Sequence, residues 1–426
     1  MAKSELRFRL KRAASSAAFM VGLSAIAVTA ASAQSDNGRN PLDTFTQDHR
    51  PNEFTQACLQ APSAKCAIEA ALQTVIAEQL GGERSRVLVA VSEALIEQGK
   101  LDQAKQTLMV ALEEAENSGL SLIYQEKLQQ IAPLLARAGD PASALAVAGE
   151  ARYGNIKDRV LRNVAREVVR LGDISAMRVS LQQLRNNRRA FWEEMTLLVE
   201  APATALQALD LDSYLETIET MKRSDRRYRG YILLSALEFK RGNPDLSDQF
   251  IRKADGLFDR FVNNALKMEI ASRRLDAMRR AGMPAEALEK SYALAIRMDT
   301  PLVQGVERWA FEELVMPYEA ETGRLDLALS RLDQIIDLDR RTRFMETIIA
   351  AKAEPMSVTA LTDRYSTALN DIRALETVFD RDLARFSVLK AAVGNGLAQD
   401  ALQIVAQFED DDSQAAALAL ASGILP

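Results

Sequence analysis

Histidine is nearly absent from this sequence, and cysteine and aromatic residues are scarce. The chain has one histidine, His49, and two cysteines, and aromatic residues make up 6% of it. A Ser–His or Cys–His nucleophile pair needs a histidine beside the nucleophile, and no glycine-rich phosphate loop or Gly-x-Ser-x-Gly motif occurs. These absences argue against the corresponding enzyme classes. Paired carboxylates stay open as catalysts, because the chain has 59 acidic residues.

Long apolar runs and strand-like patterns are also missing after the first 33 residues. No later stretch approaches the ~18–20 apolar residues of a membrane-spanning helix. No run shows sustained alternation of apolar and polar residues, and Ala, Leu, Glu, Arg and Gln dominate. The sequence therefore predicts an all-α protein that is not embedded in a membrane.

The first 33 residues have the pattern of a secretory signal peptide. A basic start precedes an apolar stretch over residues 13–30, and Ala31-Ser32-Ala33 forms a small-x-small cleavage motif. We expect cleavage after Ala33 and export to the periplasm; an uncleaved N-terminal anchor is the alternative. Residues 34–52 are polar and lack a helical period, which predicts a disordered leader.

Charge separates this chain from nucleic-acid-binding proteins. Cleavage removes five basic residues and one acidic residue, so the formal net charge changes from −6 to −10. An acidic protein with evenly mixed charges is a poor match for a polyanion. We therefore expect no nucleic-acid partner.

A short cassette recurs along the rest of the chain: an apolar helix end, a glycine, a turn residue, and a helix with alanine at a fixed offset. The double intervals between these glycines predict turns without glycine near Leu209-Asp210 and Glu354-Pro355, and a further turn is expected at residues 61–63. The mean period is about 37 residues, the length of one helical hairpin. This spacing predicts about ten hairpins and a final helix over residues 413–423. The turn glycines are Gly99, Gly139, Gly172, Gly242, Gly282, Gly323 and Gly396.

The cassette resembles the tetratricopeptide repeat. That resemblance implies a right-handed α-solenoid of about ten helical hairpins over residues 53–426, in which each repeat packs on its neighbours and a concave groove forms. An irregular helical bundle is the alternative. The residues that carry the resemblance are Leu95, Gly99, Leu101, Ala104, Leu108 and Ala111 in one repeat, Ala132, Leu135, Gly139, Ala144, Ala148 and Ala151 in the next, and Gly323, Leu325, Ala328, Leu332 and Ile335 later.

The two cysteines, Cys58 and Cys66, flank the predicted turn at residues 61–63. Both belong to the exported part, where an oxidising compartment favours a disulfide. A metal site is not expected because further ligands are missing. A redox-active pair is a weaker alternative, since the spacing is not that of the oxidoreductases.

Four arginines, Arg159, Arg162, Arg166 and Arg170, are spaced three, four and four residues apart. This spacing places them on one face of a helix, and the repeat template turns that face to the groove. Arginine forks bind carboxylates with two parallel hydrogen bonds. We therefore predict a recognition strip for an acidic segment, extended by Arg229 and Lys240. The alternative is an exposed face whose arginines pair with nearby acids: Asp158, Glu167, Glu193, Glu194 and Asp225.

Two other groups of residues have structural roles as their simplest interpretation. The aromatics near the middle, such as Trp192 and Tyr228, are expected to fill the core. The acids of residues 409–412 are expected to cap the last helix, since negative charge favours a helix N-terminus.

These features predict a non-catalytic periplasmic scaffold or adaptor that binds a protein partner in its groove, in cell-envelope assembly or maintenance. No cofactor and no metal are expected. The alternative is an accessory subunit or enzyme that acts on cell-wall glycan, related to the superhelical lytic transglycosylases. A purely architectural part of an export machine is a third option.

Overall fold

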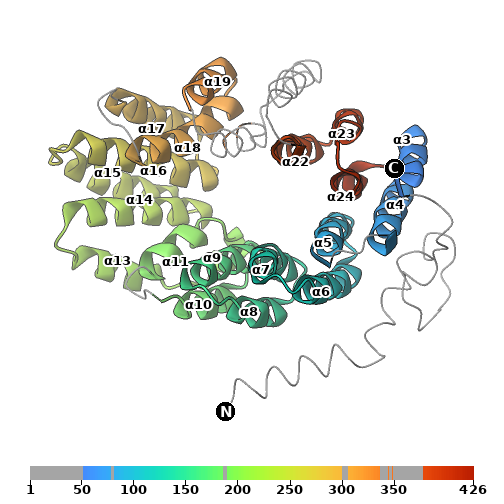
Figure 1. Cartoon of the computed structure of the whole chain (residues 1–426). Helices are drawn as coiled ribbons and strands as arrows, with labels where there is room; N and C mark the ends of the chain where they lie inside the picture. Colours follow the sequence, from blue (N-terminus) through green and yellow to red (C-terminus); the bar gives the residue numbers. More distant parts are fainter. Residues whose placement is uncertain are drawn as a thin grey trace, which may run out of the picture. The chain divides into compact units, whose positions relative to one another are not determined.

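A computed structural model describes residues 51–77, 81–185, 190–299, 306–335, 344, 348 and 378–426 (Figure 1). Every element in these ranges is a helix. They form two compact units: unit 1 takes residues up to 160 and from 360 onward, and unit 2 takes residues 161–359. The predicted signal peptide, most of the leader and the turn at Glu354-Pro355 lie outside the described residues. Within the described ranges no helix is long and apolar enough to cross a membrane.

Unit 1 consists of helical hairpins from both ends of the chain. Consecutive helices pair, as α5 does with α6, α7 with α8 and α22 with α23. The first described helix starts at Pro51, two residues before the predicted boundary. Its helices are α3 (Pro51–Gln60), α4 (Ala64–Ala77), α5 (Gly81–Glu97), α6 (Leu101–Asn117), α7 (Ser121–Arg137), α8 (Pro141–Gly149), the start of α9 (Gly154–Arg170), α22 (Val378–Gly394), α23 (Ala398–Val405), α24 (Asp411–Ala421) and the 3-10 turn η3 (Ser422–Ile424).

Unit 2 continues the same pattern, with α14 paired to α15, α16 to α17 and α18 to α19. Its core is built from the apolar faces of these helices, for example Tyr228, Phe311 and Met278. Its helices are the rest of α9, α10 (Ile174–Gln182), α11 (Ala190–Leu198), α12 (Ala203–Leu206), α13 (Leu211–Glu219), α14 (Ser224–Lys240), α15 (Pro244–Phe258), α16 (Asn264–Arg280), α17 (Ala285–Met298), α18 (Val306–Glu321) and α19 (Leu325–Asp333).

All seven predicted turn glycines end a helix in the left-handed conformation, with φ between 69° and 88°. At Gly99, for example, the Gly99 N–H donates to the carbonyl of Ile96 at 2.9 Å and the Lys100 N–H donates to that of Leu95 at 2.8 Å. A residue with a Cβ would be strained in this conformation. The helix–turn–helix positions predicted from these glycines are therefore confirmed, while the right-handed tetratricopeptide-like solenoid stays a prediction.

The stretch between Gly172 and Gly242 differs from the expectation of a single hidden turn. Between α10 and α14 it contains three short helices, α11, α12 and α13, with one turn on either side of α12. Pro202 precedes α12, where its fixed φ suits a helix start. Asp210 caps α13 by accepting hydrogen bonds from the N–H groups of Asp212 and Ser213. The turn near Leu209-Asp210 is confirmed, and the turn at residues 199–202 was not foreseen.

The C-terminal helix α24 packs against α4 and α5, which come from the start of the folded chain. All nine of its residues from 413 to 421 are buried, and the Ala64 N–H donates to the carbonyl of Pro426 at 3.0 Å. Figure 1 shows the C-terminus beside α4. A repeat array in which each repeat contacts only its sequence neighbours has no such contact. Asp410 caps α24 by accepting from the Ser413 N–H at 2.8 Å, which confirms the predicted capping role.

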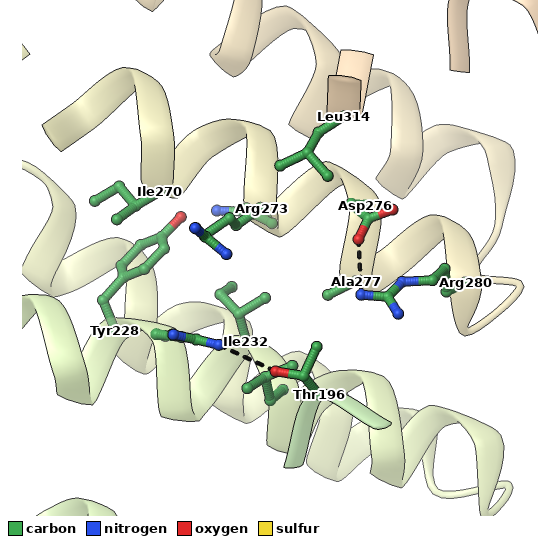
Figure 2. A pocket seen from close by; sticks show the side chains of 12 residues that line it. Thr196, Tyr228, Ile232, Ile270, Arg273, Asp276, Ala277, Arg280 and Leu314 are labelled. Carbon is green, nitrogen blue, oxygen red and sulfur yellow. Dashed lines mark hydrogen bonds and ion pairs between the residues drawn. The ribbon is translucent and has the colours of Figure 1, made fainter. Parts of the chain in front are cut away.

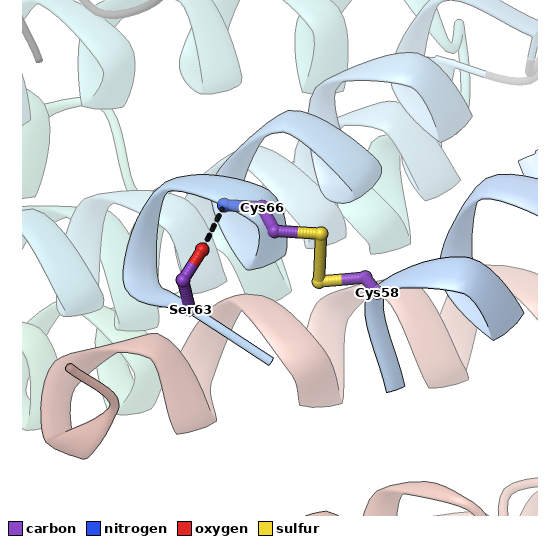
Figure 3. Close-up of a disulfide and its surroundings, with 3 residues drawn as sticks. All are labelled: Cys58, Ser63 and Cys66. Carbon is purple, nitrogen blue, oxygen red and sulfur yellow. Dashed lines mark hydrogen bonds between the residues drawn. A yellow bond between two sulfur atoms is a disulfide. The ribbon is translucent and has the colours of Figure 1, made fainter. Parts of the chain in front are cut away.

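Cys58 and Cys66 form a disulfide, as predicted, and their Cα atoms are 5.7 Å apart. The bond connects α3 to α4 across the turn at residues 61–63 (Figure 3). Ser63 starts α4 by accepting a hydrogen bond from the Cys66 N–H at 3.2 Å. The disulfide thus joins the two helices of the first hairpin, and α24 packs against both of them.

We expect no free thiol in the unfolded protein that has not been reduced. Replacing both cysteines by serine should lower the free energy of unfolding of unit 1 by about 2 kcal/mol, because the bond closes a short loop of the unfolded chain. Thiol counting and hydrogen exchange of the α4 amides measure the two effects. Two reactive thiols in the wild-type protein would refute the bond.

Candidate functional site

The predicted arginine strip lies on the exposed face of α9. The side chains of Arg162, Arg166 and Arg170 are 39%, 44% and 51% exposed. The opposite face of the helix is apolar and buried, and this division fixes the rotation of α9 about its axis. The buried residues are Val160, Leu161, Val164, Ala165, Val168 and Val169.

Arg162 and Arg166 approach acidic side chains at 3.3 Å. The Nε of Arg162 lies 3.3 Å from Glu193, and the Nε of Arg166 lies 3.3 Å from Glu200. The Nε of Arg162 has no hydrogen-bond partner among the described residues. Both guanidinium groups therefore keep donors that solvent or a ligand carboxylate can use.

Three arginines contact Glu200, whose side chain is only 9% exposed. Besides Arg166, it accepts a hydrogen bond from Arg170 at 2.8 Å and one from Arg280 at 2.7 Å. Arg170 also pairs with Glu167 at 3.0 Å. Two acids named by the pairing alternative, Glu167 and Glu193, are thus found beside the strip. Glu200 was missed because it lies in the unforeseen turn before α12.

The remaining predicted binding residues have separate surroundings. Arg159, on the same helix, donates to Gln129 at 3.2 Å within unit 1. Lys240 donates to the carbonyls of Val199 and Ala201 at 2.8 and 2.7 Å. These two carbonyls follow the C-terminal end of α11, where the helix itself offers them no donor. Burial lowers the pKa of Lys240, and Glu200 opposes this. The structure therefore does not bring all six predicted residues into one site, and a binding role for Lys240 stays a prediction.

Arg229 borders a hollow of about 130 Å³ in unit 2, between α14 and α16 (Figure 2). Its guanidinium donates to Thr196 at 3.0 Å and lies 5.0 Å from the ring centre of Trp192. Burial lowers the pKa of Arg229 to about 10, and the positive charge of Arg273 acts in the same direction. The arginine stays protonated at neutral pH, in a place that disfavours its charge.

Metal ligands are not grouped in the part of the chain that the structure describes. Within the described ranges no cluster of His, Cys, Asp and Glu has the geometry to hold a metal ion. The strip and the hollow both offer arginine donors, which are suited to binding anions. No protein-family model, no curated protein and no solved structure matches this chain.

Proposed function

We propose that this protein is a non-catalytic scaffold of the periplasm that binds an acidic segment of a protein partner on the exposed face of α9. Cell-envelope assembly or maintenance is the setting that the proposed export implies. The observation that carries this proposal is the exposure of Arg162 and Arg166, whose side chains stay about two-fifths exposed although the Nε of each lies 3.3 Å from an acid.

These ion pairs add little to stability, so a carboxylate of the bound protein can replace the acids that contact Arg162 and Arg166. Exposed pairs contribute only ~0–1 kcal/mol each to stability. A partner carboxylate that accepts two parallel hydrogen bonds from an arginine makes a stronger contact than one approached through Nε alone. Binding therefore uses donors that the fold does not need.

The test is the double substitution Arg162→Glu with Arg166→Glu. The matched control is Arg226→Glu with Arg252→Glu, which makes the same change of net charge at two exposed arginines of α14 and α15 in the same unit. Proteins captured from envelope extracts by the wild type and both variants are quantified by mass spectrometry.

We expect the α9 variant to capture at least tenfold less of the main captured protein than the wild type does. The control variant should capture as much of it as the wild type. Both variants should melt within a few degrees of the wild type, because the substituted arginines are themselves partly exposed and the buried Glu200 keeps its hydrogen bonds from Arg170 and Arg280. Equal capture by the α9 variant and the wild type would refute the proposal. A large loss of stability would assign these arginines to the fold instead.

A further inference from the structure

The hollow beside Arg229 combines an apolar wall with four arginine side chains. Figure 2 shows Ile232 on one side, from α14, and Ile270 and Ala277 on the other, from α16. These side chains are at most 6% exposed, and Leu314 of α18 adds to the same wall. The volume of the hollow, about 130 Å³, is close to that of a cavity that binds benzene, ~150 Å³.

Of the four arginines that line the hollow, three have an acidic partner. Arg273 pairs with Glu269 at 2.9 Å, Arg280 pairs with Glu200 and Asp276, and the buried Arg274 pairs with Asp255. Arg229 forms no ion pair with a described acid, and its one described hydrogen bond goes to the neutral Thr196.

Thr196 itself is held in place and does not compensate the charge. Its hydroxyl donates to the carbonyl of Trp192 at 2.6 Å, so a lone pair is presented to Arg229. The Trp192 ring supports the guanidinium from one side. The fold thus holds Arg229 in a fixed position; the charges of Glu193 and Glu269 favour its protonated form from a distance, but neither forms an ion pair with it.

Tyr228 supplies a second, independent sign of a missing polar partner. The residue is 1% exposed and lines the hollow. Its hydroxyl has no hydrogen-bond acceptor among the described residues, and the Arg274 guanidinium beside it opposes the rise that burial causes in the pKa of Tyr228. Arginine can only donate, so the hydroxyl hydrogen is left without an acceptor, and a ligand oxygen in the hollow would supply one.

We propose that this hollow is a binding site for a single carboxylate attached to an apolar body. Arg229 binds the carboxylate, and the wall of Ile232, Ile270 and Leu314 takes the apolar part. The charge of one carboxylate balances the one unpaired arginine. The carboxylate has two chemical sources, a chain terminus that ends in an apolar residue or a free aliphatic acid. This site is separate from the α9 face and does not depend on its function.

The test uses two acids and their uncharged amides: N-acetyl-leucine with N-acetyl-leucinamide, and octanoate with octanamide. The chain has two tryptophans, so the variant Trp309→Phe leaves the Trp192 indole N–H as the single indole signal in a ¹H–¹⁵N spectrum. Because Arg229 lies over Trp192, occupation of the hollow should shift that signal. Titration of each compound then gives its affinity at this site.

We expect at least one acid to shift the Trp192 signal with an affinity tenfold or more above that of its amide. Binding of N-acetyl-leucine alone identifies a chain terminus, binding of octanoate alone a free acid, and binding of both a pocket that accepts either source. No shift with either acid, or equal affinities for acid and amide, would overturn the proposal. This comparison needs no change to the hollow itself.

Arg229→Gln should then reduce the affinity for the acid at least tenfold and leave that for the amide unchanged. Arg226→Gln is the matched control, because it removes one positive charge from an exposed position of the same helix, and it should leave both affinities unchanged. Equal losses in the two variants would mean that net charge, and not Arg229, attracts the acid, which would overturn the assignment.

Discussion

We expect Leu418→Ala to lower the free energy of unfolding of unit 1 by about 2–5 kcal/mol. Leu418 is fully buried at the middle of α24, the helix that packs on α4 and α5 from the other end of the chain. Shortening its side chain leaves a cavity at this junction, and a close-packed interior relaxes only in part. Hydrogen exchange of the α4 and α5 amides under native conditions measures the effect within unit 1.

The matched control is Leu122→Ala in α7 of the same unit. Leu122 is 75% exposed, so the same substitution should change the free energy of unfolding by less than about 0.5 kcal/mol. If Leu418→Ala left α4 and α5 as protected as the control does, the contact of α24 with the first hairpin would not stabilise unit 1.

The second large effect is expected from Glu319→Ala in unit 2, a loss of about 3 kcal/mol or more. Glu319 lies on α18 and is fully buried. Both of its oxygens are 3.1 Å from the Nε of Arg331, and the Tyr292 hydroxyl donates to it at 2.9 Å. Its removal leaves a buried phenol without its acceptor and takes one of two carboxylates from Arg331, which keeps Asp299.

Glu313→Ala is the control for this prediction, since Glu313 lies on the same helix and is exposed. Urea denaturation of the two variants should give clearly different midpoints, with Glu313→Ala close to the wild type. Equal midpoints would mean that the buried network around Glu319 adds nothing to the stability of unit 2.

Much of the helical organisation follows from local signals in the sequence. Glycine is the residue that ends a helix in the left-handed conformation at no steric cost, so Gly99 and Gly242 mark turns wherever they follow an apolar helix end. The turn at residues 199–202 has no glycine and depends on Pro202, whose effect is not tied to the repeat period. The packing of α24 on α4 was not predictable, because residues far apart in sequence leave no periodic signal.

The site was predictable only in part, for a related reason. Helical spacing correctly places Arg162, Arg166 and Arg170 on one face. The spacing of residues along one helix gives no information about contacts with residues elsewhere in the chain. The contacts of the arginines with Glu200 and of Lys240 with backbone carbonyls were therefore missed. Tyr228 was expected in the core and is found there, yet it also lines the hollow beside Arg229. The sequence marked Arg229 as a binding residue but gave no sign of the apolar wall opposite.

The central claim, that the α9 face recognises an acidic segment through arginine forks, is tested most directly by salt. The affinity of the purified partner captured by the wild type is measured from low to high sodium chloride. We predict that it falls about tenfold or more as charges are screened, and that Arg162→Glu with Arg166→Glu removes most of this dependence while folding is kept. The same salt dependence in the wild type and the variant would contradict the claim.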